Sequence, residues 1–63
     1  MLTRAERLVV TEAVERTHRA GRSRAECYRA AATTLRAVFP GMATQAVAAE
    51  ALAIVLEYVQ SIG

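Results

Sequence analysis

The last third of the chain, residues 42–62, carries the strongest hydrophobic pattern in the sequence. On a helical projection of about 100° per residue its polar side chains Glu50, Glu57, Gln60 and Ser61 gather on one narrow side, and alanines and aliphatic residues fill most of the rest. A surface helix needs an apolar stripe of only about 100°. We therefore expect this helix to be covered from at least two directions.

Two amphipathic segments precede this helix. Residues 3–6 (TRAE) and 23–26 (SRAE) are capping-box motifs that start helices. Gly21 suits the left-handed position that follows a helix, and Pro40 disfavours a helical conformation in the residue before it. The pattern predicts one all-α domain over residues 1–63, a three-helix bundle with antiparallel neighbours, short turns and helices near 3–20, 23–39 and 43–61.

The apolar stripes of the first two helices consist largely of small side chains. The stripe predicted for the first helix contains Ala5, Val9, Val10, Ala13, Val14, Thr17 and Ala20. The stripe predicted for the second contains Cys27, Tyr28, Ala31, Ala32, Leu35, Val38 and Phe39. Small side chains bury little area each, at about 25 cal/mol per Å², so two such helices do not easily cover the wide apolar surface of the third.

A partner chain is the expected supplement to this small core. A 63-residue chain buries only about 60% of the surface that its unfolded form exposes, and small folds add disulfides, a metal or a partner. Cys27 is the only cysteine, which excludes an intrachain disulfide, and one histidine with no aspartate argues against a metal cage. We expect a homodimer built on the third helix, with these residues toward the partner or the shared core: Leu52, Val55, Leu56, Val59 and Ile62.

The sequence lacks the residue combinations that catalysis needs. Cys27 falls in an apolar stripe without a general base beside it. Glu50 and Glu57 are seven residues apart, too far to act as an acid–base pair on one helix, and there is no glycine-rich phosphate loop. The sequence predicts a protein that is not an enzyme and uses no cofactor, metal or small-molecule substrate.

Charge and hydropathy bear on location. Residues 1–40 carry eight Arg and four Glu, a net charge of +4, and residues 41–63 carry two Glu, a net charge of −2, which sums to +2. The N-terminus lacks the pattern of a signal peptide, and Glu50 and Glu57 interrupt the third helix as a membrane span. We expect a cytoplasmic protein with a free thiol.

Small size, absent catalytic groups and surplus apolar surface favour a regulatory or adaptor module that binds another protein. Interfaces are enriched in Arg and Met, and Leu8 lies among charged residues, away from the stripe of its helix. The candidate partner-binding residues are Arg4, Arg7, Leu8, Arg19 and Met42.

An alternative function rests on the stretch AGRSRAECYR, residues 20–29. It resembles the turn and second helix of the helix-turn-helix in tetracycline-repressor-type regulators, although Arg22 stands where that pattern usually has an apolar residue. The resemblance implies a dimeric DNA-binding regulator with the second helix as reader. In that reading Arg22, Arg24 and Arg29 contact DNA, with half-sites about 34 Å apart.

Overall fold

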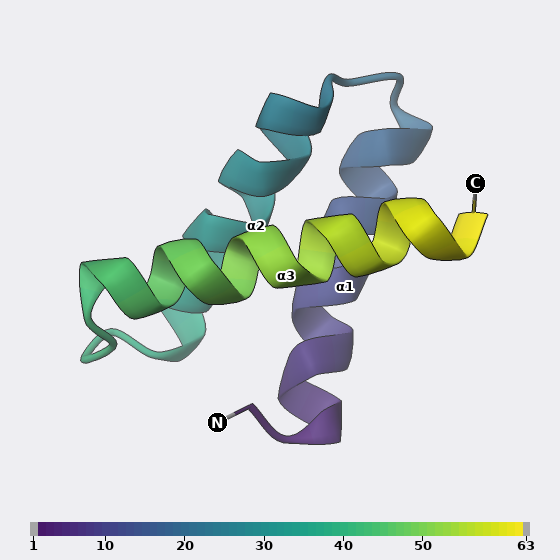
Figure 1. Cartoon of the computed structure of the whole chain (residues 1–63). Helices are drawn as coiled ribbons and strands as arrows, with labels where there is room; N and C mark the ends of the chain where they lie inside the picture. Colours follow the sequence, from purple (N-terminus) through teal and green to yellow (C-terminus); the bar gives the residue numbers. More distant parts are fainter. Residues whose placement is uncertain (1, 63) are drawn as a thin grey trace.

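The computed structural model describes residues 2–62 and contains three helices in that range, α1 (Arg4–Arg19), α2 (Arg24–Val38) and α3 (Thr44–Ile62). α1 and α2 form an antiparallel hairpin, and α3 crosses both of them on one side (Figure 1). The predicted all-α three-helix bundle is confirmed, and each observed helix boundary lies within one residue of its predicted position.

The start and end of α1 follow the predicted local chemistry. The amide of Glu6 donates to Thr3 Oγ1 at 3.1 Å, and the amide of Thr3 donates to Glu6 Oε1 at 2.8 Å, so the capping box is complete. After the helix, Gly21 has φ +78° and its amide donates to the carbonyl of His18 at 3.0 Å. Glycine reaches this left-handed conformation without steric cost, which stops α1 and reverses the chain.

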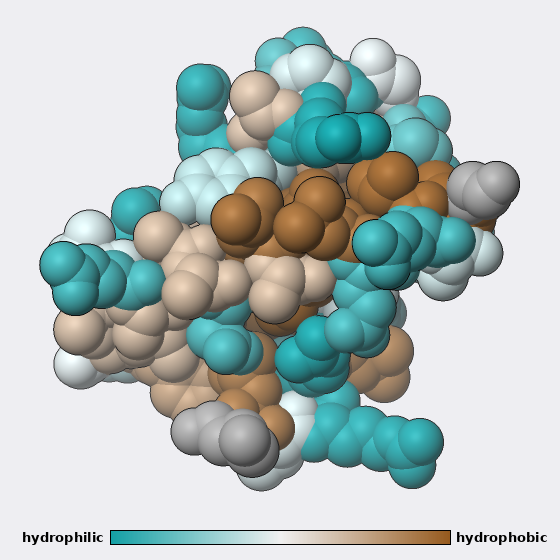
Figure 2. All heavy atoms as spheres, in the orientation of Figure 1, coloured by the Kyte–Doolittle hydropathy of each residue, from teal (hydrophilic) through white to brown (hydrophobic). Residues whose placement is uncertain are grey.

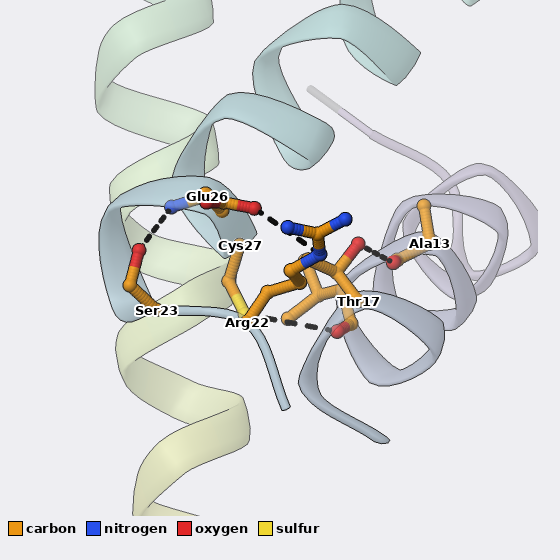
Figure 3. Close-up of polar contacts among 7 residues, drawn as sticks. Ala13, Thr17, Arg22, Ser23, Glu26 and Cys27 are labelled. Atoms are coloured by element: carbon orange, nitrogen blue, oxygen red, sulfur yellow. Dashed lines mark hydrogen bonds and ion pairs between the residues drawn. The ribbon is translucent and has the colours of Figure 1, made fainter. Parts of the chain in front are cut away.

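The second predicted capping box, at residues 23–26, forms only one of its two hydrogen bonds within the described part of the chain. Ser23 Oγ accepts from the amide of Glu26 at 3.2 Å, but the carboxylate of Glu26 pairs with Arg22 Nε at 3.5 Å (Figure 3). At the other end of α2, Phe39 has already left the helical conformation, as expected for a residue that precedes Pro40.

The core lies where α3 crosses the hairpin, and its members are mostly Val and Ala. Leu35 and Ile54 are the largest fully buried side chains. Val9, predicted to face inward, is 48% exposed, and Val38 is 40% exposed. Both predictions were wrong because α3 covers only one side of the hairpin. The core cluster consists of Val10, Val14, Cys27, Ala31, Ala32, Leu35, Val47, Ala51, Ile54 and Val55.

The chain exposes more surface than its mass requires. Its accessible surface is 4406 Å², whereas a compact protein of 6.8 kDa has about 4,000 Å² by the usual scaling with mass. The side of α3 that faces away from the hairpin contributes exposed apolar area, at Leu52 and Leu56.

Candidate functional site

The side of α3 that faces away from the hairpin is apolar along most of its length. Leu52 is 51% exposed and Leu56 is 42% exposed; Ala49 is exposed one turn earlier, and Val59 is half-buried one turn later. We call these four residues the outer α3 strip. Figure 2 shows an apolar surface along α3, paler in its N-terminal half and darker in its C-terminal half. The spacing of three, four and three residues is that of the a and d positions by which helices pair.

Charged side chains lie to one side of the outer α3 strip. Ala53 and Gln60 border it on one side and Ala48 on the other, and none of these is charged. Glu57, further round the helix, pairs with Arg7 of α1, with 2.6 Å between Oε2 and Nη2. Because both side chains are partly exposed, this ion pair contributes little stability. It does direct the carboxylate toward α1 and away from the strip.

The five residues predicted for a dimer interface occupy different environments. Leu52 and Leu56 lie on the outer α3 strip, and Val59 lies at its edge, partly packed against the core. Ile62 is 52% exposed at the end of α3. Val55 is only 1% exposed inside a single chain, so it belongs to the core and not to the free surface. Ala49, which completes the heptad spacing of the strip, is not among the five predicted residues, although the spacing is visible in the sequence.

The candidate partner-binding residues do not form one surface. Arg7 is held by Glu57 of α3, and Arg19 pairs with Glu15 of its own helix at 3.2 Å. Met42 is half-buried against the core from the turn that precedes α3. The remaining two candidates, Arg4 and Leu8, are exposed. Leu8, at 58%, is the most exposed large apolar residue on α1.

The three candidate DNA-contacting arginines are separated by the structure. Arg29 lines an open groove of about 740 Å³ between α1 and α2, together with Arg16. Arg24 instead lines a small cavity on the α3 side, beside Tyr58. Arg22, in the turn, borders both. Figure 3 shows Arg22 beside Glu26 and Thr17, and all three residues line the groove between α1 and α2.

The described residues offer a basic groove but no assembled reactive group. Cys27 is buried, and its Sγ lies 3.9 Å from the carbonyl oxygen of Val14. The ring of His18 stacks edge-on against Tyr58, with 5.5 Å between the ring centroids. Among residues 2–62 there is no group of three or more His, Cys, Asp or Glu side chains placed to hold a metal ion. The groove can attract an anion through its arginines.

No family model, curated protein or solved structure matches this chain. Within the described residues, α3 alone is long and apolar enough to cross a membrane by length and composition. The core helix of a water-soluble protein meets the same criterion, and the inner face of α3, with Val47, Ala51, Ile54 and Val55, is packed against the hairpin.

Proposed function

We propose that this chain is a non-enzymatic regulatory or adaptor module that binds protein and forms a homodimer through the outer α3 strip. The observation that carries the proposal is the exposure of Leu52 and Leu56 on a heptad spacing with uncharged neighbours. Isolated exposed leucines are common on protein surfaces, but a continuous apolar strip is typical of an interaction site. A second copy offers the same strip, so the contact is self-complementary and closes at two chains.

The small size of the core is a second reason to expect a dimer. Its largest fully buried side chains are one Leu, one Ile and four Val, which is little apolar volume for a domain of this length. Burial of Leu52 and Leu56 between two copies extends the core across the interface. We therefore expect association to stabilise the fold, with a melting temperature that rises with protein concentration.

Leu8 is the candidate contact for a different protein. It lies on α1, 58% exposed, on the side of that helix that carries Glu12, Glu15 and Arg19. An exposed leucine with charged residues around it resembles the centre of a small interface with a polar rim. A dimer built on α3 leaves this side of α1 free in both copies.

Leu52→Glu and Leu8→Glu are matched variants that test the proposed dimer. The two leucines are almost equally exposed, at 51% and 58%, so neither change buries a charge inside one chain. Size-exclusion chromatography with light scattering should return a monomer for Leu52→Glu and a dimer for Leu8→Glu. A dimer for both variants would remove α3 as the interface. Pull-downs from the native host with wild type and Leu8→Glu then test the second surface, because only the wild type should retain a specific partner.

DNA binding is the second candidate, and the Arg-lined groove is the observation that favours it. Arg16, Arg22 and Arg29 surround the groove with Glu26 as its one acidic residue. If phosphates bind there, affinity falls steeply with salt, and Arg29→Ala lowers the log–log slope by about one. Arg24→Ala is the matched control, because Arg24 lies on the other side of α2. Equal slopes for wild type and Arg29→Ala, or no duplex binding at low salt, would rule out the groove.

A further inference from the structure

We infer that the two copies of α3 pair antiparallel, with the two-fold axis near residue 54; this inference rests on the proposed dimer. In this register Leu52 packs against the partner's Leu56, and Ala49 packs against the partner's Val59. A parallel pair through the same outer α3 strip is also two-fold symmetric. The choice between the two orientations therefore depends on the side chains along the strip and on the ends of the helix.

The first observation is a gradient of side-chain size along α3. The exposed residues of its N-terminal half are small or polar, with Gln45, Ala46 and Ala49, whereas large side chains begin at Leu52 and continue through Leu56 and Val59. Figure 2 shows the same change as a shift from pale to dark brown along the helix. A parallel pair places small residues against small at one end and large against large at the other, which forces the helices apart. In the antiparallel register the leucines meet in the middle, and Ala49 meets the partner's Val59 at both ends, so the two ends of the contact have equal bulk and the helices do not splay.

The second observation concerns the helix dipole. α1 and α2 each have an acidic residue in the first turn and at least one basic residue in the last turn, which complement the partial charges of the helix ends. α3 has neither an acidic residue in its first turn nor a basic one in its last turn. An antiparallel partner brings the negative end of one α3 beside the positive end of the other, whereas a parallel partner places like ends together.

The distribution of charge on α3 is compatible with a contact between two identical strips. The strip carries no charge, and Glu50 and Glu57 lie beside it on the same side of each α3. In the antiparallel pair these carboxylates fall outside the contact on both copies, so no charge is buried when two identical strips meet.

Spin-label distances between the two copies test the orientation. Gln45→Cys and Gln60→Cys each place one nitroxide on an exposed residue at opposite ends of the strip. With a rise of 1.5 Å per residue and helix axes about 10 Å apart, the antiparallel pair predicts axial components of about 27 Å and 18 Å, and hence distances of about 29 Å for position 45 and about 21 Å for position 60. A parallel pair predicts about 10 Å at both positions, the distance between packed helices. A shift of register changes the two axial components in opposite directions and keeps their sum near 45 Å.

The unsubstituted chain is the control, because its Cys27 is buried and should take up no label. Dilution of labelled protein with unlabelled protein should reduce the dipolar modulation, which shows that the coupling is between chains. Long distances whose axial components sum to about 45 Å support the antiparallel pair. Two short distances overturn the orientation and leave the dimer intact. Samples without dipolar coupling that also have the mass of one chain overturn the dimer itself.

Discussion

Substitutions at two neighbouring residues of α3 test folding and dimer formation separately. Val55 is 1% exposed in the core, and Leu56, the next residue, is 42% exposed on the outer α3 strip. We predict that Val55→Glu prevents folding, and that Leu56→Glu leaves the fold intact but prevents dimer formation. The same chemical change one residue apart thus tests which side of α3 faces the hairpin and which side faces a partner.

The expected cost of Val55→Glu is comparable to the total stability. An unpaired carboxylate in the core costs several kcal/mol, and Val55 is itself a member of the apolar core cluster. A domain of 63 residues has a free energy of unfolding of about 3–9 kcal/mol. We therefore expect most Val55→Glu molecules to be unfolded at room temperature.

Leu56→Glu is expected to lower the stability of the dimer. Complete burial of a leucine contributes about 1.5–3 kcal/mol, so the 42% that is exposed in one chain corresponds to about 1 kcal/mol. Two symmetric copies double this value to about 2 kcal/mol, or roughly a 30-fold increase in Kd. Two carboxylates close to the two-fold axis add repulsion, so 30-fold is the minimum expected.

Circular dichroism and sedimentation velocity measure the two effects separately. Leu56→Glu should keep the helical spectrum of the wild type and sediment as a monomer, whereas Val55→Glu should lose most of its helical signal. Native-like melting of Val55→Glu would contradict the packing of α3 on the hairpin. An unchanged Kd for Leu56→Glu would contradict the assignment of the strip as the interface.

Three further predictions concern local features and are read from thermal unfolding at fixed protein concentration. Gly21→Ala should destabilise the chain by about 1 kcal/mol, because Gly21 has φ +78° and no neighbouring atom lies within 4 Å of an added Cβ, so the cost is conformational. Ser23→Ala should cost about 1 kcal/mol through loss of the α2 N-cap, and Ser23→Gly only a few tenths. Arg7→Ala should change stability by at most about 1 kcal/mol, with no difference from wild type at high salt. An unchanged melting temperature for Gly21→Ala or Ser23→Ala would contradict the first two assignments. A loss of stability for Arg7→Ala that does not depend on salt would contradict the third.

Local chemistry made the helices predictable from the sequence. Thr3, Gly21, Ser23 and Pro40 each act within a few residues, through a cap, a positive φ or a steric restriction, so they fix boundaries without knowledge of the tertiary structure. The exception is Glu26, whose side chain pairs with Arg22 instead of completing the capping box. A long side chain has several partners within reach, and the sequence does not rank them.

The burial of individual apolar residues was less predictable, because it depends on how the helices cross. Val9 and Val55 both belong to apolar patterns, but α3 covers one side of the hairpin, which exposes Val9 and buries Val55. The placement of the two arginines of α2, in contrast, can be read from the sequence. Arg24 and Arg29 are close in sequence, yet they lie on opposite sides of α2, a separation that follows from the helical period.

Sedimentation equilibrium of the unsubstituted chain over a wide range of concentrations tests the central claim most directly. The proposed dimer through the outer α3 strip predicts that the average mass approaches twice the 6.8 kDa of one chain as concentration increases. It also predicts that the curve fits a monomer–dimer equilibrium without larger species, because a two-fold contact closes at two copies. A folded chain that stays at 6.8 kDa across the whole range would contradict the account.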